Sequence, residues 1–160
     1  MLFVVVAAIS VGTNPDRFGE YAAHLRSTIE AVPGIEFIFQ LNSETQPVFD
    51  IISAKNPPSN MSILFDASCG LGIEISTLPD PSGAIPCGYA GGIGPSNIKK
   101  ILEMVSVLEQ PCEKKVWIDM ESSLRGTRSD KLVSNQDYFS IDKCFACVDV
   151  CVSAGMPVTL

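Results

Sequence analysis

Residues 62–72 read SILFDASCGLG, and residues 88–97 read GYAGGIGPSN. Each segment joins a short apolar run, of the length of a buried strand, to a polar or glycine-rich turn. The first turn begins at Asp66, and the second leads directly into an amphipathic segment. In parallel α/β sheets the carboxyl ends of neighbouring strands meet at one edge, where α/β enzymes commonly bind phosphorylated substrates. This stretch therefore predicts a site that combines a carboxylate with an anion-binding turn.

The rest of the chain alternates apolar strands with amphipathic helices. Strands are predicted over residues 2–9, 35–41, 63–65, 86–90 and 115–120, and helices over residues 15–32, 47–54, 96–109 and 141–153. Two prolines, Pro79 and Pro81, limit any helix between the third and fourth strands to about one turn, at residues 74–77. Residues 121–139 are predicted to form a long polar connection. The alternation indicates a parallel sheet with right-handed crossovers.

Length and composition indicate one folded domain over residues 1–160. Hydrophobic residues make up 46% of the chain and charged residues only 18%, which excludes the composition of a disordered protein. The net charge of -7 argues against a nucleic-acid partner, so a bound phosphate would depend on backbone N–H groups. The apolar opening lacks a basic segment and is too short to cross a bilayer, so we expect neither a secretory signal nor a membrane partner.

Six cysteines occur in the chain, and three of them, Cys144, Cys147 and Cys151, share one face of the last predicted helix. A zinc or iron–sulfur site would ordinarily need a second pair of ligands at close spacing. We therefore expect these thiols to pack in the core, with no metal and no cofactor. Their spacing also fits reduced thiols in a cytoplasmic protein better than a disulfide framework.

Two architectures accept five strand–helix units. A flavodoxin-like open parallel sheet would be complete at this length, whereas a (βα)8 TIM barrel usually needs about 250 residues. The informative turns follow three successive strands, at residues 66–72, 91–97 and 119–126, and this arrangement favours the barrel. We therefore expect an α/β, TIM-barrel-like fold that is incomplete, with about five βα units. The flavodoxin-like sheet is the alternative.

The last three units resemble phosphoribosylanthranilate isomerase, a family of tryptophan biosynthesis. In that family the sixth strand ends in an aspartate before a glycine-rich loop, the seventh runs into Ala-Gly-Gly-Leu, and the eighth runs into Val-Asp-Val-Ser-Ser-Gly. The matching segments here are residues 64–72, 90–97 and 118–123, in the same order. The resemblance covers about half of the chain and implies that residues 62–126 carry the phosphate and active site.

The resemblance implies an aldose–ketose isomerase that performs an Amadori rearrangement of a sugar phosphate. Asp66 matches the general acid of the family; its structural alternative is to cap the turn that follows it. Phosphate or substrate binding is implied for Gly70, Gly72, Gly91, Gly92, Gly94, Asn97, Asp119, Ser122 and Ser123. A tight strand-to-helix turn is the structural alternative for the glycines, and a solvated strand end is the alternative for Asp119.

The family's general base is a cysteine within Lys-Ile-Cys-Gly, and this motif does not occur in the chain. Two functions therefore stay open. The first is an isomerase acting on a phosphorylated sugar. The second is a non-catalytic barrel fragment or pseudoenzyme that binds a phosphorylated metabolite or a partner chain. Because an incomplete barrel exposes two strand edges, we expect a homo-oligomer or a partner chain that completes the barrel.

Overall fold

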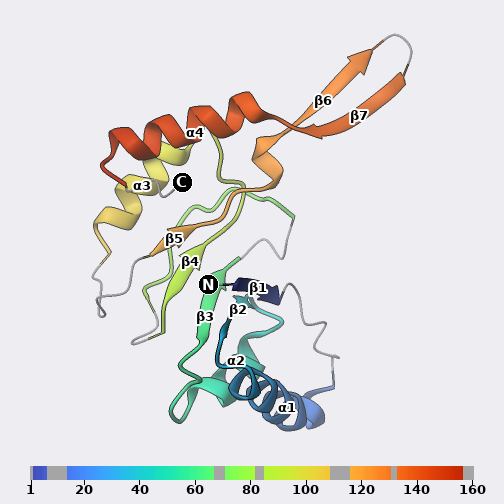
Figure 1. The fold of residues 1–160 in the computed structure, drawn as a ribbon, viewed down its shortest axis with the longest axis vertical. Coiled ribbons are helices and arrows are strands. Elements are labelled where there is room, and N and C mark those ends of the chain that lie inside the picture. The colour runs from blue at the N-terminus through green and yellow to red at the C-terminus, as the bar shows by residue number, and fades with distance from the viewer. Residues whose placement is uncertain are drawn as a thin grey trace.

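The protein is an α/β protein with a parallel sheet that alternates with helices (Figure 1). The computed structural model describes residues 2–6, 14–66, 71–81, 85–108, 116–130 and 133–156. The parallel strands are β1 (Leu2–Val6), β2 (Ile35–Leu41), β3 (Met61–Phe65), β4 (Cys87–Tyr89) and β5 (Trp117–Ile118). The helices are α1 (Phe18–Ala31), α2 (Gln46–Ser53), α3 (Ile98–Ser106) and α4 (Ile141–Ser153).

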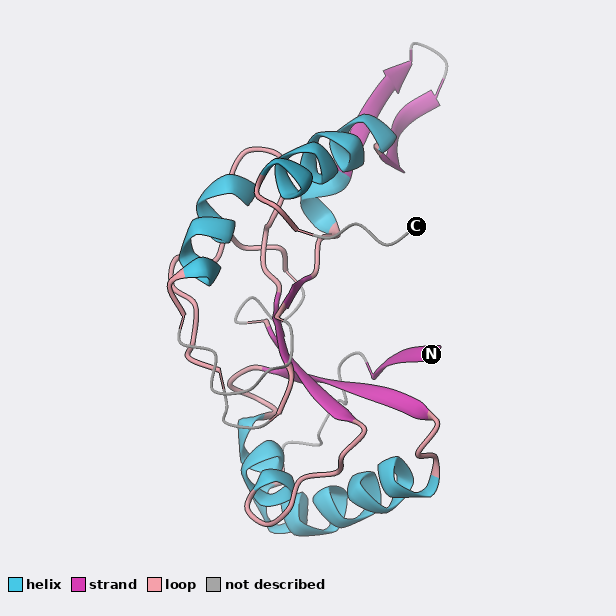
Figure 2. Ribbon diagram, turned by 60° about the vertical axis from the view of Figure 1, so that its left-hand side comes forward, coloured by secondary structure: helices cyan, strands magenta, loops and turns pink. Residues whose placement is uncertain are grey.

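The strands lie in the sheet in the order in which they occur in the chain, β1-β2-β3-β4-β5, and each neighbouring pair is parallel. This order differs from the 2-1-3-4-5 order of a flavodoxin-like sheet. When right-handed crossovers always move in the same direction, they leave every helix on one face of the sheet. Figure 2 shows this arrangement: the helices follow an outer arc, from α1 and α2 to α3 and α4, and the strands lie inside it.

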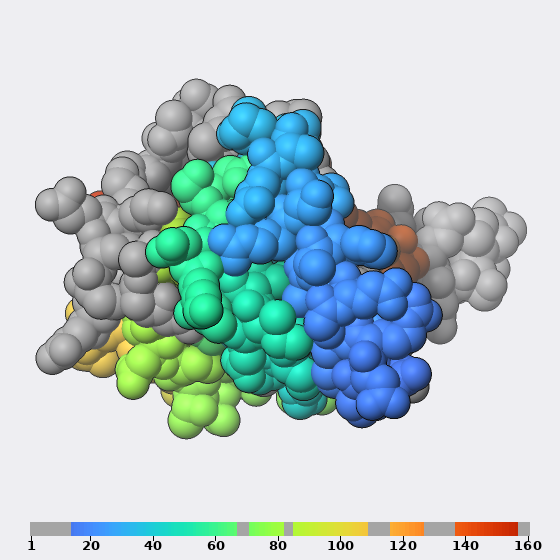
Figure 3. All heavy atoms as spheres, turned by 90° about the horizontal axis from the view of Figure 1, so that it is seen from below, coloured from blue at the N-terminus to red at the C-terminus, as the bar shows by residue number. Residues whose placement is uncertain are grey.

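The main core fills the space between the sheet and the helices. Alternate residues of β2, β3 and β4, among them Phe39, Ile63 and Tyr89, face the helices because side chains on a strand alternate between its two faces. The helices contribute the buried side chains of Ala22, Ile29, Val48, Phe49, Ile52, Ile98, Ile101 and Cys147. The space-filling view shows the segments of α1 and α2 packed side by side on the underside of the molecule (Figure 3).

Most predicted elements are confirmed. The strand over residues 35–41 and the helix over residues 141–153 have the predicted bounds, and the other described elements begin or end within a few residues of theirs. Asn14 caps the first helical segment, since its side chain accepts a hydrogen bond from the Asp16 N–H at 3.1 Å. The end of the first predicted strand, at residues 7–9, lies outside the described residues.

The connection between β3 and β4 differs from the prediction. Residues 71–81 contain no helix, so the predicted turn at residues 74–77 is wrong. Contacts with β4 fix this segment instead: the Tyr89 hydroxyl donates to the Pro79 carbonyl at 2.7 Å, and the Ile75 N–H donates to the Gly91 carbonyl. Ile75 is buried, so an apolar anchor and two hydrogen bonds hold the connection against the end of the sheet.

The prediction of a polar connection over residues 121–139 is also wrong. After a short 3-10 helix (Ser122–Leu124), strands β6 (Arg125–Asp130) and β7 (Val133–Phe139) form an antiparallel hairpin. Figure 1 shows that the hairpin projects away from the sheet, beyond the start of α4. Its two strands, RGTRSD and VSNQDYF, carry no alternating apolar pattern from which a strand could be predicted.

The cysteines of α4 contribute to packing, as expected. Cys147 is buried in the main core, and Cys144 and Cys151 are half-buried against it. Among the described residues, no helix is both long and apolar enough to cross a membrane.

Candidate functional site

A small polar pocket of about 80 Å³ lies at the carboxyl ends of β3, β4 and β5. Its lining residues are Asp66, Gly72, Ala90, Gly91, Gly92, Ile93, Asp119, Glu121 and Ser122. The sheet ladder continues one residue past each strand: the Ala90 N–H donates to the Phe65 carbonyl, and the Asp119 N–H donates to the Tyr89 carbonyl, both at 2.9 Å. This continuation aligns three successive strand ends at one level, so their turns meet at one pocket.

Asp66 is the most buried acid of the pocket, with 5% of its surface exposed. The Gln40 side chain, on the neighbouring strand β2, donates a hydrogen bond from Nε2 to Asp66 Oδ2 at 2.6 Å. Burial of a carboxylate is costly unless hydrogen bonds replace those made by water. Gln40 therefore both stabilises Asp66 and orients its carboxyl group. Gln40 could not be assigned to the site from sequence, because only the register between β2 and β3 brings the two side chains together.

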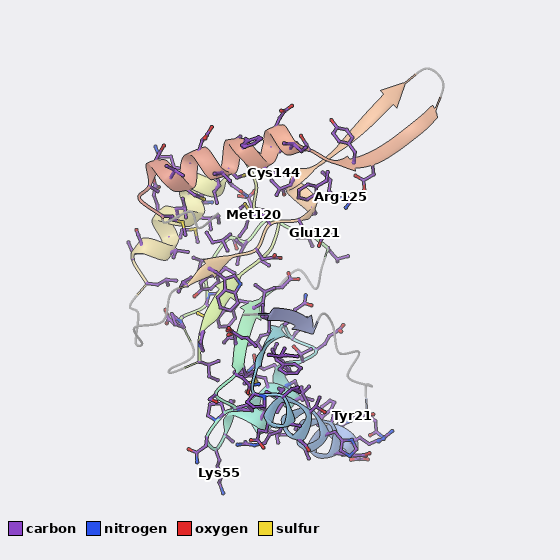
Figure 4. The ribbon with its side chains drawn as sticks, in the orientation of Figure 1. Tyr21, Lys55, Met120, Glu121, Arg125 and Cys144 are labelled. Carbon is purple, nitrogen blue, oxygen red and sulfur yellow. The ribbon has the colours of Figure 1, made fainter. Side chains whose placement is uncertain are left out.

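Asp119 and Glu121 add two further carboxyl groups to the pocket. Asp119 as a residue is exposed, yet burial of its carboxyl group at the pocket raises its pKa, and the negative charges of Glu121 and Asp66 raise it further. Figure 4 shows Glu121 just above the end of the sheet, where the chain leaves β5. The side chains of the pocket therefore present negative charge, and they favour a proton on Asp119.

The turn after β4 depends on glycine. Gly91 and Gly92 have positive φ angles of 123° and 56°, a conformation that other L-residues adopt only with strain. A Cβ atom on Gly92 would lie 2.7 Å from the Gly72 carbonyl oxygen and 2.8 Å from the Glu74 nitrogen. Within the described chain, the N–H groups of Gly91, Gly92 and Ile93 donate to no protein acceptor. The turn therefore brings three unused backbone donors into the wall of the pocket.

Two other glycines allow the turns to pack on each other. Gly72 also has a positive φ, of 66°, and a Cβ atom there would collide with Ser122 Oγ. At Gly94 a Cβ atom would lie 2.5 Å from the Cβ of Ser123. These close approaches give both glycines a packing role, whatever the pocket binds.

Asn97 supports the turn from behind. It is buried, its Oδ1 accepts a hydrogen bond from the Gly94 N–H at 2.9 Å, and its Nδ2 donates to the Gly92 carbonyl at 3.1 Å. Both ends of the amide thus hold the turn in shape. Neither Asn97 nor Gly94 lines the pocket.

The structure thus brings together six of the predicted site residues: Asp66, Gly72, Gly91, Gly92, Asp119 and Ser122. Gly94, Asn97 and Ser123 lie behind the turns, and Gly70 lies outside the described residues. Gln40 and Glu121 belong to the site without having been predicted. In the part of the chain that the structure describes, no three His, Cys, Asp or Glu side chains are grouped so as to hold a metal ion.

Comparison of the chain with models of known protein families, with curated proteins and with solved structures finds no match. The case for a function therefore depends on the geometry of the pocket and on the motif resemblance.

Proposed function

We propose that the chain is a sugar-phosphate-binding protein whose fold is part of a TIM-like (βα)8 barrel, similar to phosphoribosylanthranilate isomerase. Two features of the sheet support the barrel: the strands follow the chain order, and the helices cover one face only. An open doubly wound sheet carries helices on both faces. The pocket lies at the carboxyl ends of the strands, which is the end of a barrel that binds substrates.

The observation that carries the proposal is that Asp66 and the turn at residues 91–93 line the same pocket. Backbone N–H groups in a glycine turn are suited to a phosphoryl group, and carboxylates accept hydrogen bonds from sugar hydroxyls. The volume of about 80 Å³ matches two or three water-sized groups, since one water takes up about 30 Å³ of liquid. The pocket therefore fits a phosphoryl group, and the sugar would extend out of it.

The three carboxyl groups of the pocket repel an anion when they are ionised. Binding of a phosphate should therefore depend on pH. Protonation of Asp119 removes one negative charge from the wall of the pocket. Binding of a phosphorylated sugar should therefore strengthen as the pH falls towards the raised pKa of Asp119. A neutral sugar should show no such dependence.

Aldose–ketose isomerisation is the second candidate function, and the contrast between Asp66 and Asp119 favours it. The reaction needs an acid that protonates the ring oxygen and a base that removes the C2 proton of the opened sugar. Asp66 is buried and oriented by Gln40, while Asp119 has a raised pKa and is exposed. Carboxyl groups in such different environments suit opposite roles in proton transfer. The resemblance implies that Asp66 is the acid. Asp119 would then serve as the base above its raised pKa, where it is ionised.

The edges of the sheet suggest where a partner would bind. Among the described strands, β1 pairs only with β2, and β5 pairs only with β4. Open edges of this kind favour pairing with another chain. A second copy or a partner chain that covers them would complete the enclosure of the site.

Isothermal titration calorimetry with ribose 5-phosphate and with ribose tests the proposal. We expect saturable binding of the phosphate ester, weak or no binding of ribose, and loss of binding in Gly92→Ala. Gly34→Ala, in open space with no neighbour within 4 Å, is the matched control and should bind as the parent does. Equal binding of both sugars, or unchanged binding in Gly92→Ala, would contradict the phosphate site.

Turnover of N-(5-phosphoribosyl)anthranilate tests the isomerase separately. Asp66→Asn should abolish any turnover while retaining the binding of ribose 5-phosphate. Full activity of Asp66→Asn would remove this residue from the mechanism, and no turnover by the parent chain would leave binding as the function.

A further inference from the structure

Helix α4 carries an exposed apolar stripe on its surface. Ile141, Phe145, Val148 and Val152 are spaced by four, three and four residues, so they share one face of the helix. All four are exposed: Phe145, the largest, by 63% and Ile141 by 67%. The side chain of Phe139, at the end of β7 and two residues before the helix, is also exposed. We call these five residues the α4 stripe.

The stripe is separate from the side of α4 that the fold uses. Cys144, Cys147 and Cys151 point into the core, and Figure 4 shows Cys144 on the side of α4 that faces Met120 and the rest of the fold. A helix that only covers a core needs one apolar face. Here the apolar surface continues past the core face into solvent, and contiguous exposed apolar surface is typical of a binding site.

The charges beside the stripe are negative. Asp142 and Asp149 each follow a member of the stripe by one residue, so they border it on the side away from the core, and both are exposed. Lys143 is the one basic residue of α4, and its Nζ donates to the Arg125 carbonyl at 2.5 Å, on the other side of the helix. No positive charge of α4 therefore neutralises the acidic border. Asp149 also lines the cavity between α3 and α4, which includes Lys99 and Glu103 of α3.

We propose that the α4 stripe is the docking surface for a basic amphipathic helix of another protein. The spacing of four, three and four residues is that of a two-helix seam, in which an apolar row fits against the row of a facing helix. Lysine or arginine residues beside the apolar row of the partner would lie against Asp142 and Asp149. The surface lies in the helix layer, so this docking is independent of the phosphate site and of the open strand edges.

The same charges disfavour two other occupants. In an antiparallel pairing of two copies, the same borders face each other, so Asp142 and Asp149 of one copy would lie against those of the second copy. Each chain also carries a net charge of -7. An amphipathic helix that binds anionic membranes has lysine and arginine on its polar face, whereas this border is acidic.

Fluorescence anisotropy with two labelled peptides tests the proposal on the full chain. Both peptides are helices of about 18 residues, long enough to be partly helical alone, with the same leucine row. One has lysines beside the row and the other has glutamates. We expect the lysine peptide to bind, the glutamate peptide to bind at least about tenfold more weakly, and the difference to shrink at high salt.

Three variants locate the binding. Phe145→Ser with Val152→Ser should weaken binding of the lysine peptide by about tenfold or more. Val107→Ser, which removes an even more exposed apolar side chain at the end of α3, should not change the binding. Asp149→Lys should weaken binding of the lysine peptide and strengthen binding of the glutamate peptide. Glu44→Lys makes the same change in net charge in an exposed loop, and it should do neither.

Several results would overturn the proposal. These are equal binding of both peptides, no binding of either, or binding that survives the Phe145 and Val152 changes. Self-association in sedimentation that these changes abolish would assign the stripe to a second copy instead. Binding to phosphatidylserine vesicles that the same changes abolish would assign it to a membrane.

Discussion

The two faces of the sheet differ in what covers them. The face towards the helices carries the main core, in which Phe39, Ile63 and Tyr89 are fully buried or nearly so. On the opposite face, the side chains that the structure describes form a cluster of three buried apolar residues, Ile38, Leu64 and Ala90, with Trp117 packed against it.

The same face of β2 and β3 also carries polar groups. Gln40 hydrogen bonds to Asp66, and Ser62, fully buried, donates to the Glu36 carboxylate. A covered face can hold apolar side chains in a dense core, whereas the opposite face holds groups whose hydrogen bonds must be satisfied. The difference indicates that the helix face supplies most of the stability and that the opposite face, where it ends at the pocket, supplies the chemistry.

The largest expected effect comes from neighbouring residues of β3 that point to opposite faces. Ile63 is 0% exposed in the main core, and Leu64 is 7% exposed in the small cluster. Ile63→Ala should lower the free energy of unfolding by about 4 kcal/mol, and Leu64→Ala by about 2 kcal/mol, because a sparse cluster relaxes more easily around a cavity. Urea denaturation measures both values. An equal or larger loss for Leu64→Ala would contradict the contrast between the faces.

The next effect concerns the turn where the opposite face ends. Gly92→Ala combines a positive φ with a Cβ atom under 3 Å from the backbone of Gly72 and Glu74. We expect it to lower the free energy of unfolding by about 3 kcal/mol, since strain and overlap add. Gly155→Ala, with a φ of 80° and open space around it, should cost about 1 kcal/mol from strain alone. A smaller loss for Gly92→Ala than for Gly155→Ala would show that the turns are not packed as described.

A smaller effect tests the hydrogen bond between Gln40 and Asp66. Gln40→Leu removes a donor to a buried carboxyl group and should lower the free energy of unfolding by about 1.5 kcal/mol. The matched control is Gln46→Leu. Gln46 donates a hydrogen bond from its amide to the Asp50 carboxylate at 2.7 Å, as Gln40 does to Asp66, but on the exposed surface of α2. That change should cost under about 0.5 kcal/mol. Similar losses measured by urea denaturation would mean that burial does not strengthen the bond.

The smallest effect is the pH dependence that Asp119 causes. Its pKa is raised in the folded state, so the folded chain retains this proton to a higher pH than the unfolded chain does. The stabilising effect of that proton is complete below the unfolded pKa of about 3.9 and is lost as the pH rises through the folded pKa. Asp119→Asn should therefore be more stable than the parent at neutral pH, by less than about 1 kcal/mol because solvent screens the exposed residue.

Urea denaturation of Asp119→Asn and of the parent at pH 4 and pH 7 measures this dependence. The advantage of the variant should shrink at pH 4. Asp50→Asn, at an exposed position of α2, controls for the loss of one carboxylate elsewhere. An advantage that is larger at pH 4 than at pH 7 would reverse the sign and contradict the raised pKa.

Much of the fold could be predicted because its strands and helices bury apolar faces. The bounds of β2 follow from an aromatic and β-branched run between a Pro-Gly break and a polar turn, and those of α4 follow from apolar periodicity that ends before Gly155. The hairpin of β6 and β7 could not be predicted, since its two strands are mostly polar and carry no apolar alternation.

The site could be predicted only in part, for a related reason. The order of the turns places three strand ends together in any parallel sheet, so Asp66, Gly92 and Asp119 were found from sequence. Gln40 reaches Asp66 through the register between β2 and β3, which cannot be read from the sequence. The hydrogen bonds of the Asn97 side chain to the backbone of Gly92 and Gly94 likewise depend on how the turn folds, and the residue type alone does not predict them.

The most direct test of the central claim is a titration of the 15N-labelled chain with ribose 5-phosphate, followed through the backbone amides of Gly92 and Ile93 by NMR. Phosphate bound by the turn predicts saturable shifts of these two signals that are absent with ribose. Signals that stay in place, or that move equally with ribose, would contradict a phosphate site at the end of the polar face.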